Sequence, residues 1–403
     1  MARTKKPAKA GGSPSKGSPT KSSFSSTSPT RPNTALFALV FASCSAAGLW
    51  LMRVETGIKD IPVKFIDQIE NARYHNGVPL REHYTGIEAI DFFRYLVTAF
   101  IAGPLGWDEG VRVQQLHFLV QFFAVVAVWN VEGCRGRNAW KTFSFTALFA
   151  LFYQTIGGAC IVPLYYLSFA LSTSKDSYFT SGRAVSLPYA KGMLFSVVVG
   201  YLVPTLAMYT PGMSAETAQL LTLIWQPAPA FVNLLLLISS LVLRPSSSTG
   251  VTSTRTPADV KHLRRVYNAA AIVAGLNHVI TMYICLTSTH PQLSLSYVFI
   301  PQRATWADST TAGLHYIFQI DWWGCFVPTL IWAWMSVYDV HRMLLGRAGV
   351  TTSQLVSWAF YIVGMSVAFG PGGMLALVWS WREDRLVMIE SGVRGTLKKP
   401  KTA

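Results

Sequence analysis

Apolar segments alternate with short polar connectors along most of this chain. A helix needs about 20 residues to cross the roughly 30 Å hydrocarbon core of a bilayer. Eight runs meet or approach this length, at 34–52, 113–130, 142–171, 192–210, 217–243, 266–286, 313–338 and 353–381. The pattern predicts an all-α fold, namely a polytopic transmembrane helical bundle of about eight spans, with seven to nine as the range.

Glycine and proline interrupt several of these runs. The last run contains Gly370, Pro371, Gly372 and Gly373 in succession, which predicts a bend or a break there. Proline also occurs inside other runs, at positions 163, 204, 227, 229 and 328. Kinked helices of this kind favour an internal cavity within the bundle.

A more polar segment, 53–112, separates the first run from the second. Within it, 86–103 carries apolar residues at helical spacing together with Glu88, Asp91 and Arg94. We expect an amphipathic helix lying at the membrane interface. A polar transmembrane span is the alternative, and it would bring the number of spans to nine.

These patterns divide the chain into five parts. They are a disordered basic tail (1–33), an N-terminal transmembrane anchor (34–52), a polar loop with an amphipathic helix (53–112), a transmembrane catalytic bundle (113–381) and a basic C-terminal tail (382–403).

Composition and charge fit a membrane protein. The chain is 51% hydrophobic and 13% charged, about half the charged fraction of an average soluble domain. Of the net charge of +15, the segment 1–33 carries +7 and the segment 382–403 carries +3. Basic tails beside apolar segments are typical of anionic-lipid contact or topology setting. We therefore expect a multi-pass membrane protein, in the endoplasmic reticulum, with the lipid bilayer as a partner and without nucleic acid.

Several catalytic classes lack their motifs. The sequence contains no GxxxxGK[ST], GxSxG or HExxH. Its cysteines and histidines never cluster at metal-ligand spacing. We therefore expect no metal and no other cofactor.

Two acidic residues stand out by their position. Glu132 ends the run that begins at residue 113, and Asp321 lies inside the run 313–338. An ionisable group at such depth costs a few kcal/mol, so a function is the default hypothesis. A carboxyl kept neutral by burial can donate a proton, and we predict both as catalytic residues. The structural alternatives are an ion pair of Glu132 with Arg135 or Arg137, and a packing hydrogen bond for Asp321.

The number of runs between these acids predicts where they lie relative to each other. Four apolar runs separate Glu132 from residue 313, and an even number of crossings returns the chain to the same side. Asp321 is eight residues into its helix, about 12 Å deep at 1.5 Å per residue. We therefore expect both carboxyls to approach the same leaflet.

Polar and aromatic residues near these acids are candidates for binding the substrate. Aromatic faces stabilise nearby cations, although an interfacial aromatic belt is the alternative for these rings. Asn277 and His278 lie mid-span, where a bond to a neighbouring helix and a ligand contact are both open. The predicted substrate-binding residues are Trp129, Arg135, Asn138, Asn277, His278, Tyr316, Trp322 and Trp323.

Two short motifs carry a resemblance to a known family. One is an acid in an Asn-x-Glu-Gly-x-Arg-x-x-Asn turn around Glu132, and the other is Asp321 followed by Trp322 and Trp323. A multi-span chain with these motifs resembles the fungal integral-membrane terpene cyclases of meroterpenoid biosynthesis, a secondary metabolism. The tail, the anchor and the loop 53–112 make it more similar to the longer branch, which acts on farnesylated substrates.

The resemblance implies an acid-initiated, metal-independent cyclase of the isomerase or lyase type. Glu132 and Asp321 match the two acids that the family links to substrate protonation, at a terminal epoxide or alkene. A prenylated lipophilic substrate is implied, and a prenyltransferase or an epoxidase could act in the same pathway. The alternatives are a proton-coupled transporter of a small apolar metabolite, in which the same carboxyls move protons, and a non-catalytic scaffold or receptor.

Overall fold

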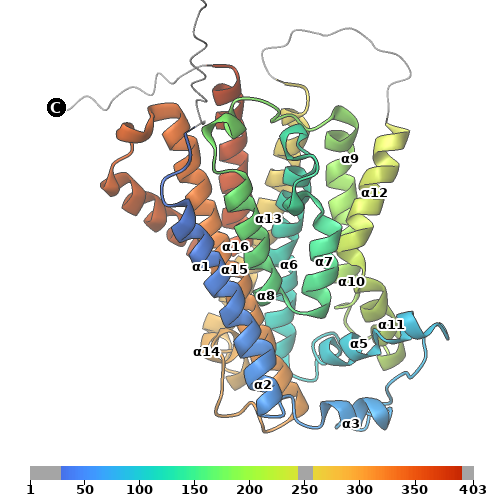
Figure 1. The fold of residues 1–403 in the computed structure, drawn as a ribbon. Helices are drawn as coiled ribbons and strands as arrows, with labels where there is room; N and C mark the ends of the chain where they lie inside the picture. The colour runs from blue at the N-terminus through green and yellow to red at the C-terminus, as the bar shows by residue number, and fades with distance from the viewer. Residues whose placement is uncertain (1–28, 244–256, 393–403) are drawn as a thin grey trace, which may run out of the picture.

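The computed structural model describes residues 29–243 and 257–392, and helices joined by loops form this part of the chain (Figure 1). No β-strand occurs within these two ranges, so the predicted all-α bundle is confirmed. The α-helices are α1 (Thr34–Leu49), α2 (Glu55–Ile58), α3 (Phe65–Glu70), α4 (Glu88–Asp91), α5 (Arg94–Phe100), α6 (Glu109–Gly133), α7 (Thr146–Thr155), α8 (Gly158–Ser172), α9 (Leu187–Val197), α10 (Val203–Ala207), α11 (Ala215–Trp225), α12 (Ala228–Val242), α13 (Val260–Thr287), α14 (Leu295–Phe299), α15 (Thr310–Leu345) and α16 (Thr352–Glu390). Two π-helical segments, η1 (Trp50–Val54) and η5 (Val198–Leu202), join α1 to α2 and α9 to α10. The 3₁₀ turns are η2 (Gly136–Asn138), η3 (Thr142–Ser144), η4 (Asp176–Phe179), η6 (Pro291–Leu293) and η7 (Arg347–Gly349).

Several helices are long and apolar enough to cross a membrane. Within the described residues there are five, or six if the pair α11–α12, bent by 55°, counts as one span. The five are Thr34–Ile58, Glu109–Gly133, Leu187–Ala207, Val260–Thr287 and Thr352–Glu390. The predicted count of eight is higher, because it also counted 142–171 and the α15 region.

The outer face of the bundle is apolar. On α12, Leu234, Leu237 and Leu241 are exposed, and on α13, Leu276 and Ile280 are exposed. Large exposed apolar surfaces mark contact with a membrane or with another protein. The apolar helices therefore indicate membrane association.

Helix α6 forms the centre of the bundle (Figure 1). Nearly every residue from Gly110 to Glu132 is buried, because α13, α15, α16 and α9 pack around it. A helix surrounded by others needs no polar face. Its apolar residues accordingly extend around all sides.

The run 142–171 is two helices, and its prediction as one span is wrong. Helices α7 and α8 form a hairpin whose turn contains Gly157 at a φ of 120°, a conformation that favours glycine. The Lys141 Nζ donates to the Ser172 carbonyl across 3.1 Å, so the start of the hairpin lies beside its end. The chain therefore reverses its direction once more than was predicted.

Helix α16 is broken at Gly370, as the sequence predicts. Gly370 has a φ of 75° and a ψ of 160°, which only glycine adopts readily. The Gly372 N–H donates to Gln121 Oε1 at 2.9 Å, so the break lies directly against α6.

Residues 59–107 form a cap at the end of the bundle where α6 begins (Figure 1). Its α4 and α5 have 4 and 7 residues, so neither crosses a bilayer and the alternative of a span at 86–103 is excluded. The buried Asp91 carboxylate accepts the backbone N–H groups of Tyr84, Thr85 and Gly86 and thereby closes a loop of the cap.

Part of each predicted tail belongs to the folded bundle. Arg31 is buried, and its guanidinium bonds Asp339 Oδ2 at 2.6 Å, so residues 29–33 lie against the bundle. At the other end, α16 continues to Glu390, well past the predicted boundary at residue 382. The rest of both predicted tails, 1–28 and 393–403, lies outside the described residues.

Candidate active site

A cavity of about 480 Å³ lies between the cap and the bundle. Its wall combines the end of the N-terminal helix, the cap, α6, the α7–α8 turn, α11 and α15. The lining residues are Met52, Arg53, Thr56, Gly57, Ile61, Pro62, Phe65, Phe92, Tyr95, Leu96, Ala99, Phe100, Phe118, Leu119, Phe122, Tyr153, Gln154, Thr155, Gly157, Gly158, Tyr201, Trp225, Leu314, Ile317, Phe318, Asp321 and Cys325. Asp321 is the one acid and Arg53 the one cationic residue among them.

Asp321 projects from α15 toward the first turn of α8. Its Oδ1 accepts the Ala159 backbone N–H at 2.5 Å. The Cys325 Sγ, one helical turn further along α15, lies 3.9 Å from the same oxygen. The free N–H groups at a helix N-terminus favour negative charge. The N-terminus of α8 therefore stabilises a negative charge on the Asp321 carboxyl group.

Aromatic rings form much of the remaining wall. Phe100 makes ring contacts with Trp225 at 5.1 Å and with Phe318 at 4.7 Å between centroids. Phe122 contacts Tyr153 edge to face at 5.1 Å. The negative faces of such rings attract cations. A cavity with a largely aromatic and apolar wall is suited to a cationic intermediate.

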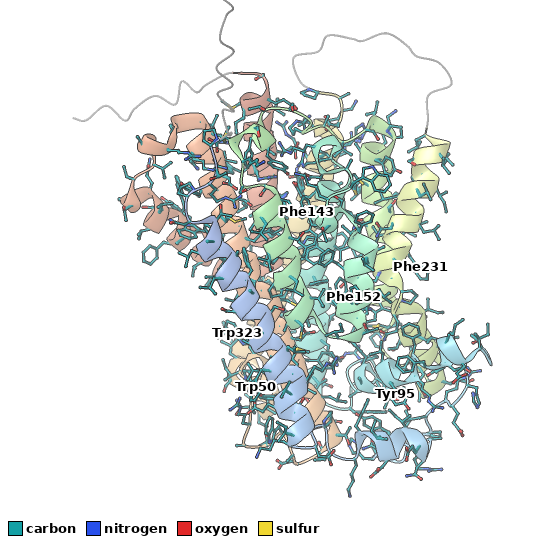
Figure 2. All side chains as sticks on the ribbon, viewed as in Figure 1. Trp50, Tyr95, Phe143, Phe152, Phe231 and Trp323 are labelled. Carbon is teal, nitrogen blue, oxygen red and sulfur yellow. The ribbon has the colours of Figure 1, made fainter. Side chains whose placement is uncertain are left out.

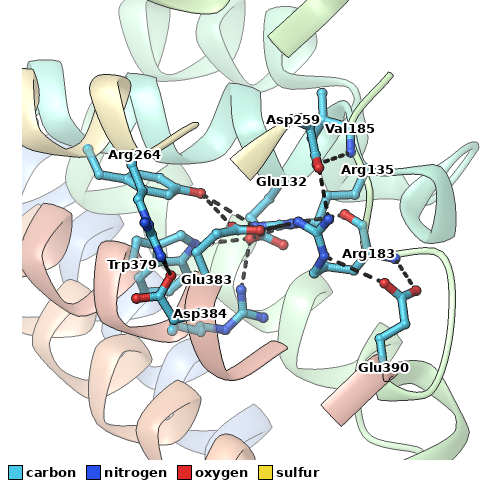
Figure 3. A network of polar contacts seen from close by, with 12 residues as sticks. Glu132, Arg135, Arg183, Val185, Asp259, Arg264, Trp379, Glu383, Asp384 and Glu390 are labelled. Atoms are coloured by element: carbon cyan, nitrogen blue, oxygen red, sulfur yellow. Dashed lines mark hydrogen bonds and ion pairs between the residues drawn. The ribbon is translucent and has the colours of Figure 1, made fainter. Parts of the chain in front are cut away.

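Glu132 lies in a buried ion network at the other end of α6 (Figure 3). Its Oε1 accepts from Arg135 Nε at 2.9 Å, from Arg382 at 2.9 Å and from Trp379 Nε1 at 3.0 Å. Glu383 continues the network, because it pairs with Arg135 at 2.5 Å. Of the two readings of Glu132, the structure therefore shows the ion pair with Arg135.

The network continues through Arg183, which pairs with Glu383 and, at 2.9 Å, with Asp259. The three buried acids Glu132, Glu383 and Asp259 thus face three buried arginines, which are Arg135, Arg183 and Arg382. A fourth acid, the partly exposed Glu390, lies 3.5 Å from Arg183 Nε at the edge of the network. Buried charges persist when each has a partner of opposite sign.

The two acids are far apart, so the prediction that they approach the same leaflet is wrong. Trp322, next to Asp321, donates to His117 of α6, so Asp321 lies near the level of His117. Glu132 is 15 residues further along α6, or about 22 Å at 1.5 Å per residue. The α7–α8 hairpin adds one reversal of chain direction, and this places the two acids at different levels of the bundle.

The predicted substrate-binding residues near Glu132 do not line the cavity. Trp129 stacks on Tyr165 with 3.7 Å between ring centroids. Arg135 belongs to the ion network, and the Asn138 side-chain amide donates to the Glu132 carbonyl at 2.8 Å. These contacts hold the turn after α6.

The polar residues predicted at mid-span connect helices to one another. Trp322 Nε1 lies 3.3 Å from His117 Nδ1, and His117 Nε2 lies 3.1 Å from His278 Nδ1. His278 Nε2 is 3.0 Å from the Val367 carbonyl. Because the indole can only donate, the chain is satisfied when each histidine carries its proton on Nε2. This places His278 and Trp322 behind the cavity wall, together with Asn277, whose Oδ1 lies 3.4 Å from the Gln121 side-chain nitrogen.

The other two predicted residues on α15 also bind protein groups. The Tyr316 hydroxyl accepts from Arg303 Nε at 3.2 Å, and Trp323 Nε1 donates to the Phe299 carbonyl at 2.8 Å. Neither lines the cavity. Of the residues predicted for the site, Asp321 alone does.

Sequence reasoning missed most of the cavity wall. Cys325 was detectable, because a residue four positions after Asp321 shares its helix face. The pair Gly157 and Gly158 was a second signal, since a glycine pair inside an apolar run marks a turn or a close approach. The cap residues gave no signal, because their contact with the bundle joins segments distant in sequence.

The described residues contain no group of three histidine, cysteine, aspartate or glutamate side chains that could hold a metal ion.

Comparison with known proteins gives matches along most of the chain. The CtvD domain family matches residues 33–388. Terpene cyclase ascI of Acremonium egyptiacum is 26% identical over 89% of this chain and 94% of its own length. Terpene cyclase ctvD of Aspergillus terreus is 28% identical, over 39% of this chain and 46% of its own. FAD-dependent monooxygenase anuJ of Penicillium roqueforti is 25% identical over 91% of this chain but only 42% of its own length. No solved structure matches.

Proposed function

The chain belongs to the CtvD domain family, and from this premise we propose that it is a terpene cyclase embedded in a membrane. Its substrate is a prenylated, meroterpenoid-type precursor, which it converts into a cyclic isomer. Two relatives that carry the name terpene cyclase support the activity, and one of them aligns along 94% of its length. A transporter is not favoured, because those relatives are named as cyclases.

One observation carries the assignment of the acid. Asp321 is the one carboxyl on the wall of an apolar, aromatic cavity, and a backbone N–H holds its Oδ1. Its partly buried position on a largely apolar wall favours the neutral acid, which can donate a proton. We assign Asp321 the role of proton donor.

The reaction requires no net change of atoms. The Asp321 proton passes to the oxygen of a terminal epoxide, or to the terminal carbon of an alkene. The epoxide C–O bond then breaks, or the alkene becomes a tertiary cation, and the electron pair of the next double bond closes a ring. The final cation loses a proton, so the product has the mass of the substrate. The N-terminus of α8 stabilises the Asp321 carboxylate, and the aromatic wall stabilises the cation.

We propose a structural role for Glu132. It accepts hydrogen bonds from two arginines in a network that joins α6 to α16. A carboxylate held by two guanidinium groups is ionised and has no proton to donate. Its loss would impair cyclisation through the fold.

We further propose that the protein is multi-pass in the endoplasmic reticulum membrane. The bilayer would dissolve its lipophilic substrate, and enzymes such as a prenyltransferase or an epoxidase would supply that substrate.

The test uses microsomes that contain the full chain and a farnesylated phenol or its terminal epoxide. We expect a cyclised isomer of unchanged mass, detected by liquid chromatography and mass spectrometry. Asp321→Asn should reduce the rate by about 10²–10⁴-fold, the usual contribution of a general acid. Asp308→Asn, which changes an exposed acid just before α15, is the matched control and should retain activity. Full activity in Asp321→Asn would refute the assigned proton donor.

A further inference from the structure

The cavity reaches the surface of the protein at a small group of residues. Among its lining residues, Arg53, Gly57, Phe92 and Thr155 are exposed. They come from the end of the N-terminal helix, from the cap and from the end of α7. We call these four residues the mouth.

Large apolar side chains are exposed near the mouth. Trp50 and Ile58, on the helix that carries Arg53, are 55% and 70% exposed, and Phe152 of α7 is 43% exposed. Figure 2 shows Trp50, Phe152 and the cavity residue Tyr95 on the three elements that border this region. A water-filled entrance would carry polar side chains at these positions. The rim is therefore suited to contact with lipid.

The mouth also has a defined position along a candidate membrane span. Arg53 and Gly57 lie within the last six residues of the apolar helix Thr34–Ile58. The ends of a span of this length lie near the boundary between hydrocarbon and headgroups. An amphiphilic molecule places its polar group at that boundary and its chain in the hydrocarbon.

Arg53 supplies a hydrogen-bond donor at this position. Its Nε and Nη2 donate to the carbonyls of Ile156 and Thr155, at 2.7 and 3.3 Å. Its Nη1 has no partner among the described residues. The π-helical segment Trp50–Val54 shifts the helix register where Arg53 occurs, and such insertions are frequent at functional sites.

We propose that the substrate enters sideways from the bilayer through this mouth, with its prenyl chain first, and that Arg53 Nη1 binds an oxygen acceptor on its polar ring. This inference rests on the proposed function and specifies its substrate class, an amphiphile with a prenyl chain and an oxygen-bearing head. The apolar rim admits the chain, and the cation at the boundary retains the head. The distal end of the chain is thereby directed into the aromatic cavity that contains Asp321.

Gly57 permits a direct test of the route. A Cβ atom at Gly57 would meet nothing within 4 Å, and the same holds at the exposed Gly364 of α16. A side chain therefore meets no clash at its Cβ at either position, but only Gly57→Trp narrows the mouth. In nanodiscs of fixed lipid content, we expect Gly57→Trp to lower kcat/KM at least 10-fold, chiefly through KM. Gly364→Trp should stay within 2-fold of the wild type. Unchanged kcat/KM in Gly57→Trp would refute the lateral route.

Arg53 is tested with paired substrates, one with ring oxygens and one without. We expect Arg53→Met to lower kcat/KM at least 10-fold for the oxygenated substrate and less than 2-fold for the other. An equal loss for both substrates would show that Arg53 acts through the α7–α8 turn or through its charge near Asp321, and would refute head-group binding. Arg53→Lys keeps the charge and should give an intermediate loss for the oxygenated substrate alone, so it serves if Arg53→Met fails to fold.

Turnover measurements on the wild type distinguish failure of the proposed function from failure of the proposed entry route. Absence of turnover by the wild type with every prenylated substrate would refute the proposed function. Turnover by the wild type that Gly57→Trp leaves unchanged would refute only the route of entry.

Discussion

The Ala159 backbone N–H and the Asp321 carboxylate are 2.5 Å apart, so the α7–α8 turn holds the acid of α15. Asp321 is thus fixed by backbone from another helix, at a point where that helix exposes unpaired N–H groups. Any change in this turn should move the carboxyl relative to the cavity.

Gly158→Ala tests this dependence. A Cβ at Gly158 would lie 2.5 Å from Cys325 Sγ and 3.1 Å from Asp321 Oδ1. We expect α8 and α15 to separate and the cyclisation rate to fall about 10-fold or more, while overpacking costs about 1–3 kcal/mol of stability. Gly158→Ala with Cys325→Ala removes the nearer clash and should recover part of the rate. An unchanged rate in Gly158→Ala would contradict the close packing of the two helices.

Glu132→Gln should act on stability. The substitution leaves Arg382 and Arg135 buried with one fewer anion, and breaking a buried ion pair costs about 3–5 kcal/mol. Thermal unfolding in detergent, followed by tryptophan fluorescence, should show a clearly lower midpoint. Asp321→Asn is the comparison variant. It should lose activity, and its unfolding midpoint should fall less than that of Glu132→Gln. A Glu132→Gln protein with wild-type stability but no activity would contradict the structural role and indicate that Glu132 takes part in catalysis.

Gly370→Ala tests the contact between the broken helix and α6. Gly370 and Gly346 share a backbone conformation, with φ 75° and ψ near 160°, which costs about 1–3 kcal/mol for other residues. A Cβ at Gly370 would also collide with the Gln121 side chain, whereas one at Gly346 would meet nothing within 4 Å. Both alanine variants should be destabilised, and Gly370→Ala by about 1–3 kcal/mol more in unfolding measurements. Equal losses would show that Gln121 moves aside without cost.

Asp91 should make the cap sensitive to acid. The hydrogen bond from the Thr85 N–H contributes most to lowering the pKa of Asp91 from 3.8 to about 2. Hydrogen bonds from Tyr84, His83 and Gly86 add to this effect, and together they outweigh the opposing effect of desolvation. A lowered pKa in the folded state means that this stabilisation is complete above about pH 4 and lost as the pH falls toward 2. Hydrogen exchange of amides 84–86, corrected for intrinsic rates, should therefore show protection that decreases over this range.

Asp91→Asn provides the control for that titration. It should give weaker protection at pH 6 and no corresponding transition between pH 4 and 2. A transition that persists in Asp91→Asn would assign it to another acid.

Sequence identified Asp321 because an acid inside an apolar run is a local feature. The free energy of burying a charge is high wherever the helix packs, so the residue is conspicuous without knowledge of its neighbours. The break at Gly370 was predictable for the same reason, since backbone strain belongs to the residue itself. The ion pair of Glu132 with Arg135 was among the predicted alternatives, because residues three apart on a helix are neighbours. The rest of the network was not predictable, because Arg183 and Glu383 approach it from distant segments.

The sequence by itself determined an all-α, membrane-type bundle, since hydropathy and helical length depend on each segment alone. The tertiary structure decided which acid faces the cavity. That outcome depends on whether residues 142–171 form one helix or two, and a turn at Gly157 costs little when neighbouring helices cover both halves. One added reversal of chain direction placed Glu132 and Asp321 at different levels of the bundle. The direction of each helix depends on every turn before it, whereas the apolarity of a segment depends on that segment alone. The sequence therefore determined which segments are apolar, and the fold decided where in the bundle each acid lies.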